Sequence, residues 1–483
     1  MRKLFTLIAA ALFATASFAT DYKDSLVVTV NGVITEQNAT VSLTQDAEGL
    51  YTFSLKNFVL ESGGQKMPIG TITIDGLKAF EAGGNTMLQD SRNLAIVNGD
   101  DPSVSTWMGP MLGNIPINLT AKISDEKVYA SIAITMAMLN QVIDVTFGSG
   151  YQLPNSGFET FYDETTVGKG LMVPASWHSF GSAKGVLAGF VNGTKHTEKS
   201  TETRPGSTGE SSVKVTATSV LGNAANGTIT TGRMNAGSVS AASTDNHAEM
   251  DMSLTDTDTA GNPYYTAMVG RPDSLSVWVK FTQGKANASH PYATVTAAIT
   301  DGTYYQEPRD KEYANVIAYA QNNKIETKGG EWQHIVIPFD YISDAAGKAV
   351  MVTISTNADP GQGSDGDAIY VDDLSFIYDA GIASSRVADG KVDLTLKGHS
   401  AFANTVYGQK DGRDVATVTV YSDDLKKQET QEFDLGEATG INTVKHAETP
   451  AAIYNINGQR VSTMRHGQVY ILKQGQQTSK KLY

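Results

Sequence analysis

The segment Ser274-Leu275-Ser276-Val277-Trp278-Val279 shows the pattern that decides the fold of this chain. Apolar side chains recur there at every second position, which is the spacing of a β-strand with a buried face. The same period of two returns at residues 25–30, 50–55, 71–74 and 128–132. Long stretches with the 3.6-residue apolar period of a helix are scarce. The sequence therefore predicts an all-β protein.

Turn residues divide these strands into blocks. Asn-Gly or Asp-Gly pairs, which suit tight hairpin turns, stand at residues 31–32, 75–76, 192–193, 301–302 and 457–458. Residues 21–148 hold about eight short strands, the number with which an up-and-down barrel closes and loses its edges. Residues 151–378 form a second block, residues 379–440 a small β region or linker, and residues 441–483 a tail.

The first 19 residues have the features of a secretory signal. Arg2 and Lys3 precede an apolar run from Leu4 to Phe13, and Ser17-Phe18-Ala19 supplies a small-residue cleavage site. The apolar run is shorter than the roughly 20 residues that span a bilayer, and no other segment is comparable. We therefore expect a signal peptide at residues 1–19, no transmembrane segment, and export to the cell surface, the exterior of the outer membrane or the extracellular space.

Composition excludes several classes of function. The chain has no cysteine, which rules out disulfides, zinc–thiolate sites and cysteine nucleophiles. Its formal net charge is −14, so it should repel phosphate backbones, and no basic cluster offsets this charge. Nucleic acid is therefore not an expected partner.

Each block resembles a known family, and the strings that carry each resemblance follow. Residues 23–148 resemble the calycin-like barrel of surface proteins from Gram-negative gut bacteria, through Ser54-Leu55-Lys56-Asn57-Phe58, Met67-Pro68-Ile69-Gly70, Trp107-Met108-Gly109 and Val145-Thr146-Phe147-Gly148. Residues 151–378 resemble the family called "putative carbohydrate metabolism domain", through Gly157-Phe158-Glu159, Trp177-His178-Ser179-Phe180, Arg204-Pro205-Gly206-Ser207-Thr208-Gly209 and Tyr370-Val371-Asp372-Asp373. The tail resembles type IX secretion sorting domains, through Ile453-Tyr454-Asn455-Ile456-Asn457-Gly458-Gln459-Arg460-Val461 and Gly467-Gln468-Val469-Tyr470-Ile471.

The second resemblance implies a sugar-binding jelly roll, a β-sandwich whose opening strand at residues 157–159 lies beside its closing strand at residues 370–376. Sugars present flat patches of C–H groups on which aromatic rings stack, while polar neighbours bind the hydroxyls. Trp177, Tyr304 and Tyr305 are the stacking candidates, and His178 and Arg204 the hydrogen-bonding ones. The alternative for Trp177 is a buried core anchor.

Two further tryptophans lie within strands. Trp278 stands in a strand that is dense with apolar residues, and we expect it in the core. Trp332 differs in parity from Ile335, Ile337 and Phe339, so it should face the other side of its strand or lie at the strand start.

The same resemblance implies a structural calcium ion where the opening and closing strands meet. Calcium takes six to eight oxygen ligands, and one or two carboxylates suffice when backbone carbonyls complete the shell. Glu159 and Asp372 are the implied ligands. Asp373 is the reserve, because neighbours on a strand point to opposite faces. The alternative is that these carboxylates are solvated or make ordinary turn hydrogen bonds.

The sequence thus favours a secreted or surface-displayed, non-catalytic carbohydrate-binding protein. A glycoside hydrolase is the second hypothesis, since such enzymes need only two suitably spaced carboxyl groups and rarely carry a sequence motif. The serine-hydrolase motif Gly-x-Ser-x-Gly is absent. A structural or adhesive surface protein with a protein partner is the third hypothesis, in which the aromatic residues are simply core.

Overall fold

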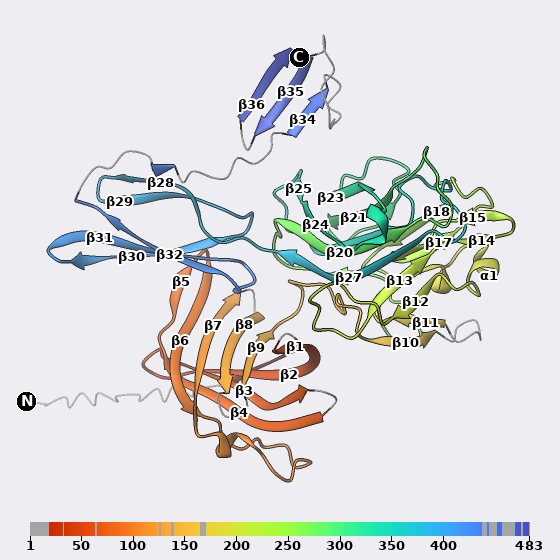
Figure 1. Ribbon diagram of the computed structural model, residues 1–483. Coiled ribbons are helices and arrows are strands. Elements are labelled where there is room, and N and C mark those ends of the chain that lie inside the picture. Colours follow the sequence, from red (N-terminus) through yellow and green to blue (C-terminus); the bar gives the residue numbers. More distant parts are fainter. Residues whose placement is uncertain are drawn as a thin grey trace, which may run out of the picture. The chain divides into compact units, whose positions relative to one another are not determined.

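The computed structural model describes residues 19–31, 33–62, 65–124, 127–136, 140–164, 171–436, 442–443, 452–455, 469–474 and 477–482. Strands dominate these residues and helical segments are single short turns, as expected for an all-β protein (Figure 1). The predicted signal peptide, except Ala19, and much of the sorting-like tail lie outside the described residues. No helix among the described residues is long and apolar enough to cross a membrane.

The chain divides into two compact units. The first comprises residues 1–381, 397–405 and 418–431, and the second comprises residues 382–396, 406–417 and 432–483. The predicted barrel and the second block both belong to the first unit. The small β region predicted at residues 379–440 is shared between the two units.

The N-terminal block folds into one curled antiparallel sheet of nine strands, ordered β4-β3-β2-β1-β9-β8-β7-β6-β5. These strands are β1 (Ala19–Val30), β2 (Val33–Gln45), β3 (Tyr51–Ser62), β4 (Gln65–Leu77), β5 (Phe80–Ala82), β6 (Asn85–Ala95), β7 (Asn114–Ser124), β8 (Lys127–Met136) and β9 (Gln141–Phe147). The sequence predicted about eight, and the three-residue β5 accounts for the difference. Alternate side chains of the long strands point inward and form one buried apolar cluster that includes Val28, Phe53 and Ile132.

The curled sheet closes where β4 meets the residue just beyond β6. Thr71 and Val97 exchange backbone hydrogen bonds of 2.9 and 3.2 Å. A Cβ atom added to the neighbouring Gly70 would lie 2.1 Å from the carbonyl oxygen of Val97, so the two segments approach too closely for any side chain there. The short 3₁₀ helix η1 (Gly109–Leu112) packs at the same place, because an added Cβ on Gly109 would lie 2.4 Å from the carbonyl oxygen of Ile69. Small residues therefore permit the closure.

The second block contains a β-sandwich. Its five-stranded sheet has the order β12 (Thr197–Ser200), β13 (Ser212–Thr216), β27 (Ala368–Ile377), β20 (Ser274–Thr282) and β24 (Gln333–Pro338). Its six-stranded sheet has the order β16 (Thr228–Thr230), β26 (Ala349–Ser355), β21 (Ala293–Thr300), β23 (Val316–Ile325) and β25 (Asp340–Tyr341), with β19 (Thr266–Ala267) also paired to β26. Val277 and Phe281 from the first sheet and Val295 and Ile354 from the second share one buried core. The predicted sandwich is therefore present.

A third layer covers part of the outer face of the six-stranded sheet. It contains β17 (Arg233–Ala236), β18 (Asn246–Met250), β22 (Tyr305–Glu307), the turn η3 (Phe180–Ser182) and the short helix α1 (Ala188–Val191). This layer packs on the sheet through Phe180, Met234 and Tyr305, which form one buried cluster with Ala298 and Met351 of the sheet. Both faces of β26 are therefore buried, which explains why its sequence is apolar almost throughout.

The remaining elements are short hairpins and small sheets. Within the second block they are β10 (Phe161–Glu164), β11 (Leu171–Pro174), β14 (Thr218–Val220), β15 (Asn223–Ala225) and η4 (Lys328–Gly330). After it come β28 (Ile382–Ala388), β29 (Lys391–Leu396), β30 (Phe402–Lys410), β31 (Arg413–Tyr421), β32 (Gln428–Asp434), β33 (Asn442–Thr443), β34 (Ala452–Asn455), β35 (Val469–Gln474) and β36 (Gln477–Leu482). The last three pair as an antiparallel sheet.

The jelly-roll resemblance implied an opening strand at residues 157–159, and this prediction is wrong, because no strand forms there. Residues 154–157 form a turn and residues 158–159 follow it without regular structure. Phe158 has a φ of 54° and packs its ring against Trp177. A positive φ does not fit a strand. The turn still lies beside the closing strand, since the Leu374 amide donates to the carbonyl of Ser156 at 3.0 Å. The strand on this edge of β27 is β13, which pairs with residues 368–371.

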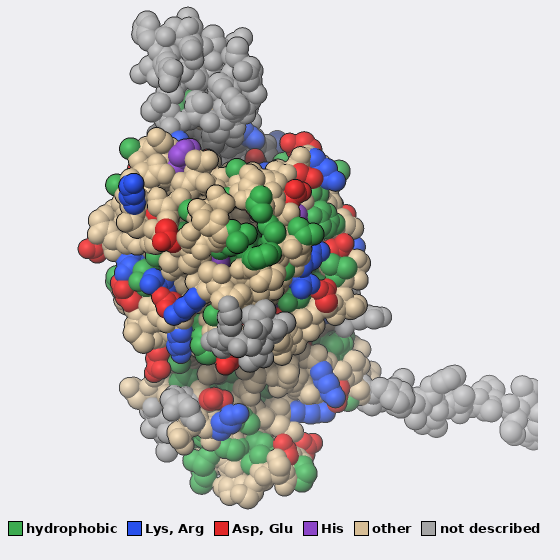
Figure 2. Space-filling model, turned by 90° about the vertical axis from the view of Figure 1, so that its right-hand side faces the viewer, with side chains coloured by type: hydrophobic (Ala, Val, Ile, Leu, Met, Phe, Trp, Pro, Cys, Tyr) green, Lys and Arg blue, Asp and Glu red, His purple; other side chains and the backbone are tan. Residues whose placement is uncertain are grey.

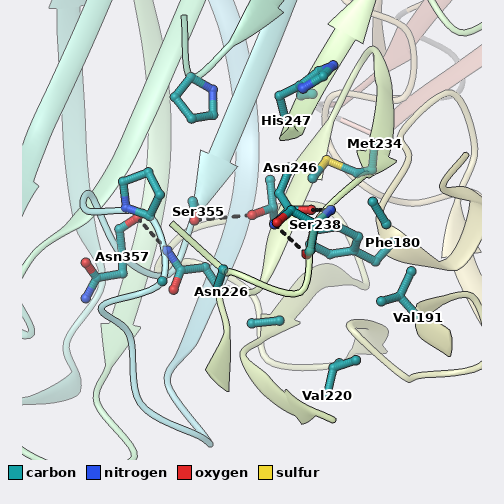
Figure 3. A pocket seen from close by; sticks show the side chains of 18 of the residues that line it. Phe180, Val191, Val220, Asn226, Met234, Ser238, Asn246, His247, Ser355 and Asn357 are labelled. Carbon is teal, nitrogen blue, oxygen red and sulfur yellow. Dashed lines mark hydrogen bonds between the residues drawn. The ribbon is translucent and has the colours of Figure 1, made fainter. Parts of the chain in front are cut away.

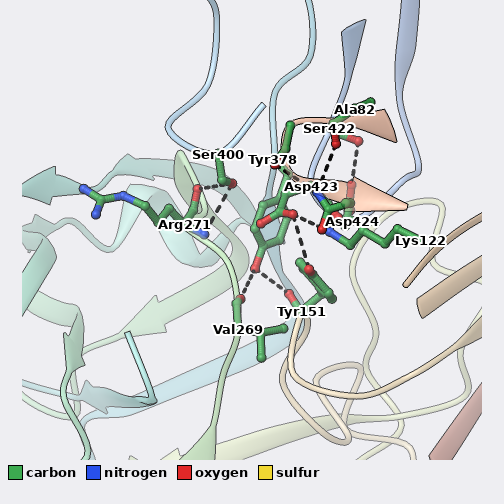
Figure 4. A network of polar contacts seen from close by, with 12 residues as sticks. Ala82, Lys122, Tyr151, Val269, Arg271, Tyr378, Ser400, Ser422, Asp423 and Asp424 are labelled. Atoms are coloured by element: carbon green, nitrogen blue, oxygen red, sulfur yellow. Dashed lines mark hydrogen bonds and ion pairs between the residues drawn. The ribbon is translucent and has the colours of Figure 1, made fainter. Parts of the chain in front are cut away.

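A buried polar network lies within the first unit (Figure 4). Lys122 of β7 forms an ion pair with Asp423, and its side chain is only 4 % exposed. The Tyr151 hydroxyl donates to the same carboxylate at 3.3 Å, and the Tyr378 hydroxyl donates to the Tyr151 carbonyl at 3.1 Å. Burial lowers the pKa of Lys122, and the Asp423 charge opposes this shift. The ion pair between Lys122 and Asp423 is therefore largely buried from solvent.

Candidate functional site

The outer face of the five-stranded sheet carries a group of half-buried aromatic rings. Leu275, Val277 and Phe281 of β20 point into the sandwich core, and Trp278 points the other way. The expectation that Trp278 belongs to the core is therefore wrong. Trp278, Lys280 and Thr282 are partly exposed on this face, whereas Ser276 is buried. Trp332 lies just before β24 on the same side, as its parity predicted.

These rings form two contacting pairs. Trp278 stacks on His334 with ring centroids 4.9 Å apart and an interplanar angle of 19°. Trp332 meets Tyr370 of β27 edge to face, at 6.4 Å and 68°. Strand pairing places them together, because Trp278 lies opposite His334 in β24 and the next outward residue of β20 lies opposite Tyr370. We call Trp278, Trp332, His334 and Tyr370 the aromatic face.

Charged side chains surround the aromatic face. The Lys280 ammonium lies 4.1 Å from the centre of the Tyr370 ring, and the Lys214 ammonium lies 5.8 Å from it. Lys280 pairs with Glu202, and Lys214 pairs with Glu198 at 2.8 Å. The rings are thus flanked by positive and negative side chains, which supply both hydrogen-bond donors and acceptors. A hydroxyl-rich ligand needs this combination.

Arg204 lies in the loop between β12 and β13 and holds this loop against the aromatic face. Its guanidinium lies 5.4 Å from the centre of the Trp278 ring. Its amide donates to Asp372 Oδ2 at 2.9 Å, and its Nε donates to Asp373 Oδ2 at 2.5 Å. A bulge in β27, opposite Val277, together with a φ of 41° at Asp373, lets both carboxylates reach Arg204. Asp372 and Asp373 therefore both contact Arg204, although neighbours on a regular strand would point to opposite faces.

The two implied calcium ligands come near each other. The Glu159 carboxylate accepts hydrogen bonds from the Glu210 amide at 3.0 Å and from the Ser211 amide and hydroxyl at 3.3 and 3.1 Å. Asp372 is fully buried, and its Oδ1 has no hydrogen-bond partner among the described residues. Burial raises the pKa of Asp372 to about 6, and the charges of Asp373 and Glu159 act in the same direction.

The carboxylates of Glu159, Asp372 and Asp373 form a negatively charged cluster. This cluster only partly resembles a metal centre. Within the described residues, no three histidine, cysteine or acidic side chains stand together in a metal-binding arrangement. A cation there would need backbone carbonyls in addition to Glu159 and Asp372. In this cluster, Asp372 Oδ1 is buried without a hydrogen-bond partner among the described residues. A cation or a proton next to this oxygen would therefore be favourable.

Three of the residues predicted from sequence are buried away from solvent. Trp177 has no exposed surface, and its Nε1 donates to the carbonyl of Pro154 at 3.2 Å. Tyr305 is likewise enclosed, and its hydroxyl donates to Glu307 at 2.6 Å. These two rings cannot stack on a ligand in this structure. His178 is buried with Asp258, 3.3 Å from Nε2 to Oδ2.

The remaining two predicted residues are accessible but lie on different layers. Arg204 belongs to the aromatic face, whereas Tyr304 precedes β22 in the third layer. Tyr304 is 37 % exposed, and its hydroxyl donates to Gln306 at 2.8 Å. Burial and the charge of Glu249 raise the pKa of Tyr304 to about 12. The structure therefore does not bring the five predicted sugar-binding residues into one site.

A cavity of 180 Å³ lies on the outer face of the six-stranded sheet. Residues of the third layer and of the β14–β15 hairpin form its walls, among them Phe180, Val191, Val220 and Met234 (Figure 3). Hydrophobic side chains gather around a hollow on the side of the molecule that Figure 2 shows. No residue of the aromatic face lines this cavity.

Comparisons with known proteins bear mainly on the N-terminal block. Residues 18–149 match the model of the calycin-like β-barrel domain family. No curated protein matches the chain. Among solved structures, a protein described as a putative outer membrane protein from Bacteroides fragilis NCTC 9343 is matched over 70 % of this chain and 97 % of its own, at 9 % identity and a TM-score of 0.21. The chain thus carries a calycin-like β-barrel domain at residues 18–149, as its N-terminal strings predicted.

Proposed function

We propose that this is an exported, non-catalytic carbohydrate-binding protein that holds a glycan against the aromatic face. The observation that carries the proposal is the row of partly exposed rings, Trp278, Trp332 and Tyr370, on a sheet surface flanked by Lys214 and Lys280. The resemblance of residues 151–378 to a carbohydrate-associated family supports it. The apolar run near the N-terminus supports the export.

The chemistry of the face suits a sugar better than a charged or a purely apolar ligand. Rings on a sheet can lie against the C–H side of a pyranose, and each such contact contributes about 1 kcal/mol beyond area burial. Lys280 and Lys214 can donate to ring hydroxyls while they keep their carboxylate partners. Because the face is shallow and few hydroxyls can be bound at once, we expect weak binding per site that gains from multivalency.

A glycan array, followed by titration of the best ligand, tests the proposal. Trp332→Ala and Tyr370→Ala should each weaken binding by about 5- to 10-fold, since each removes one stacking contact of about 1 kcal/mol. Tyr304→Ala is the matched control, because Tyr304 is an exposed ring in the third layer. Its affinity should equal that of the wild type. Absence of any glycan ligand, or an equal loss in the Tyr304 variant, would contradict the proposal. Release of reducing sugar would indicate a hydrolase instead.

We also propose that calcium supports this region, with Glu159 and Asp372 as its side-chain ligands. The support is the partnerless buried Oδ1 of Asp372 and the negative charges of Glu159 and Asp373 near it. Bound calcium would neutralise this charge and link the segment at residues 157–159 to β27. Backbone carbonyls would have to supply most of the other oxygens.

Thermal unfolding with and without calcium tests this second proposal separately from sugar binding. Calcium should raise the melting temperature of the wild type, because it binds only the folded state. Asp372→Asn should abolish the rise. Asp344→Asn, at an exposed carboxylate, is the control and should keep it. A wild type whose melting temperature is the same in calcium and in chelator would exclude the ion and leave the glycan proposal standing.

We propose further that residues 441–483 are a sorting module. The tail strings and the antiparallel β34-β35-β36 sheet support this assignment. Expression in a bacterium with type IX secretion tests it: removal of the tail should keep the protein inside the outer membrane, while the full chain reaches the surface. Surface display of the shortened chain would contradict the assignment.

A further inference from the structure

The cavity on the six-stranded sheet exists because the third layer covers only part of that sheet. Along β21 the outward side chains are Thr294, Thr296 and Ala298. Ala298 is sealed by the third layer, whereas Thr294 and Thr296 line the cavity, as do Thr353 and Ser355 of β26. The floor is therefore a row of hydroxyls on rigid strands.

The walls and rim of the cavity are apolar. Phe180, Leu187 and Val191 come from the segment around η3 and α1, and Val220 from the β14–β15 hairpin. At the rim, Phe190 is 60 % exposed and Val239 is 64 % exposed. A ligand that covers these exposed apolar side chains removes their surface from water, which favours binding.

Most polar groups of the cavity already have partners. The Thr228 hydroxyl donates to Ser355 at 3.2 Å. Asn226 donates to the carbonyl of Asn357 at 3.4 Å, and Asn246 accepts from the Ser238 amide at 3.1 Å, so both amides hold loops in place. Thr294 is the exception. Its hydroxyl has almost no accessible surface and no partner among the described residues, so a rotation of the side chain about χ1 would let it make a hydrogen bond to a ligand.

The lining also limits the charge of a ligand. It contains no lysine, arginine or aspartate. Its carboxylate, that of Glu307, accepts from the Tyr305 hydroxyl at 2.6 Å and from the Tyr319 hydroxyl at 3.1 Å. Its imidazole, that of His247, lies 2.7 Å from the carbonyl of Thr244. A buried anion would therefore find no lysine or arginine in the lining and would be strongly disfavoured, while the Glu307 carboxylate is already held by two hydroxyls.

We propose that this cavity binds an uncharged, mainly apolar small molecule that makes one hydrogen bond to Thr294. A volume of 180 Å³ somewhat exceeds the roughly 150 Å³ of an apolar cavity that holds a single benzene ring. A ligand with one or two fused rings, or an equally compact aliphatic group, matches this size. The site lies on the sheet opposite to the aromatic face and does not depend on sugar binding.

Calorimetric titration with naphthalene and with 1-naphthol tests the proposal. The wild type should bind both with one-to-one stoichiometry, and 1-naphthol more tightly. Thr294→Val keeps the shape and removes the hydroxyl. It should weaken 1-naphthol by about 3- to 10-fold, the value of one buried hydrogen bond, and leave naphthalene unchanged. Equal effects on both ligands would overturn the role of Thr294.

A second variant tests the cavity itself. Ala225 is half-buried in β15 and lines the cavity, so Ala225→Phe should fill it and remove binding of both probes. Ala288→Phe, at an exposed position outside the lining, should bind like the wild type. Failure of the wild type to bind either probe overturns the proposal, as does full binding by the Ala225 variant. Selective capture of tryptophan-bearing peptides without binding of either probe would show a protein-docking groove and would also overturn it.

Discussion

Asp372 and Lys122 are both buried charged residues, but their electrostatic surroundings differ. Lys122 has a carboxylate partner in Asp423, and aromatic rings surround its stem, with the ammonium 4.6 Å from the centre of the Tyr151 ring. Asp372 receives one backbone hydrogen bond on one oxygen and none on the other. Removal of the charge should therefore destabilise the protein at Lys122 and stabilise it at Asp372.

Asp372→Asn should change how stability depends on pH. Burial raises the pKa of Asp372 from 3.8 to about 6, so the folded protein binds this proton more tightly than the unfolded chain does. The stability that the protonated group contributes is full below pH 3.8 and is lost as the pH rises through about 6. In chelator at neutral pH the variant should be more stable than the wild type, by up to about 3 kcal/mol.

Denaturant unfolding over a pH series measures this difference, which should disappear near the pKa of a free aspartate. The exposed Asp344→Asn variant should follow the wild type at every pH. A difference between the Asp372 variant and the wild type that stays constant with pH would contradict the raised pKa.

Lys122→Met should destabilise the first unit. The substitution keeps apolar contacts with the surrounding rings but leaves the Asp423 carboxylate, which is 14 % exposed, without its cation. Breaking a buried ion pair from one side costs about 3–5 kcal/mol. The double variant Lys122→Met/Asp423→Asn should recover more than half of the loss, as measured by thermal unfolding. A double variant that is no more stable than the single one would show that the charge pair is not the cause.

At the scale of elements, strand periodicity predicted the sheets well, whereas the orientation of individual side chains was harder to predict. Trp278 has the parity of Ser276 and Lys280, and this polar pattern could have placed it on the outer face. Its apolar character favoured the core instead. The turn before Phe158 and the bulge at Asp373 depend on contacts with residues distant in sequence, so the local strings gave no sign of them.

Gly70→Ala should weaken the closure of the barrel. A Cβ atom at this position would lie 2.1 Å from the Val97 carbonyl oxygen, and the φ of 131° is unfavourable for alanine. The backbone bridge between β4 and Val97 would have to open, with an expected loss of about 2–3 kcal/mol. Hydrogen exchange should show faster exchange of the Thr71 and Val97 amides.

Gly189→Ala is the matched control for Gly70→Ala. No atom lies within 4 Å of an added Cβ at Gly189, and its φ is not in the positive range. This variant should keep the stability and the exchange pattern of the wild type. Unchanged exchange in the Gly70 variant would show that the closure tolerates a side chain.

At the scale of the whole molecule, strand periodicity and turn residues predicted a β-barrel block followed by a second β-rich block, and the resemblance to known families implied that these are a calycin-like barrel and a sandwich. The third layer and its cavity were not predicted. Their walls come from segments around residues 180, 220 and 240, which are brought together by packing on β21 and β26. The alternation of threonine with apolar residues at residues 293–297 was the local sign that β21 has a polar outer side, but it did not reveal what would cover that side.

The overall charge should shape ligand preference. The chain carries a formal net charge of −14, and Lys214 and Lys280 at the aromatic face are already paired with glutamates. Sulfated glycans should therefore bind more weakly than neutral glycans of the same backbone. The difference should shrink as salt is added, because ions screen the repulsion over about 10 Å at 0.1 M. Titration of a matched pair at two ionic strengths measures this, and tighter binding of the sulfated form would contradict it.

The two sheets of the sandwich are back to back, and each proposed site uses the surface that faces away from the shared core. Packed sheets are separated by about 10 Å of side chains, so occupants of the two surfaces cannot touch each other. Saturation of the cavity should then leave the glycan affinity unchanged. A copy anchored to a polysaccharide would still be free to load and unload an apolar cargo, and the middle block would act as a tethered carrier.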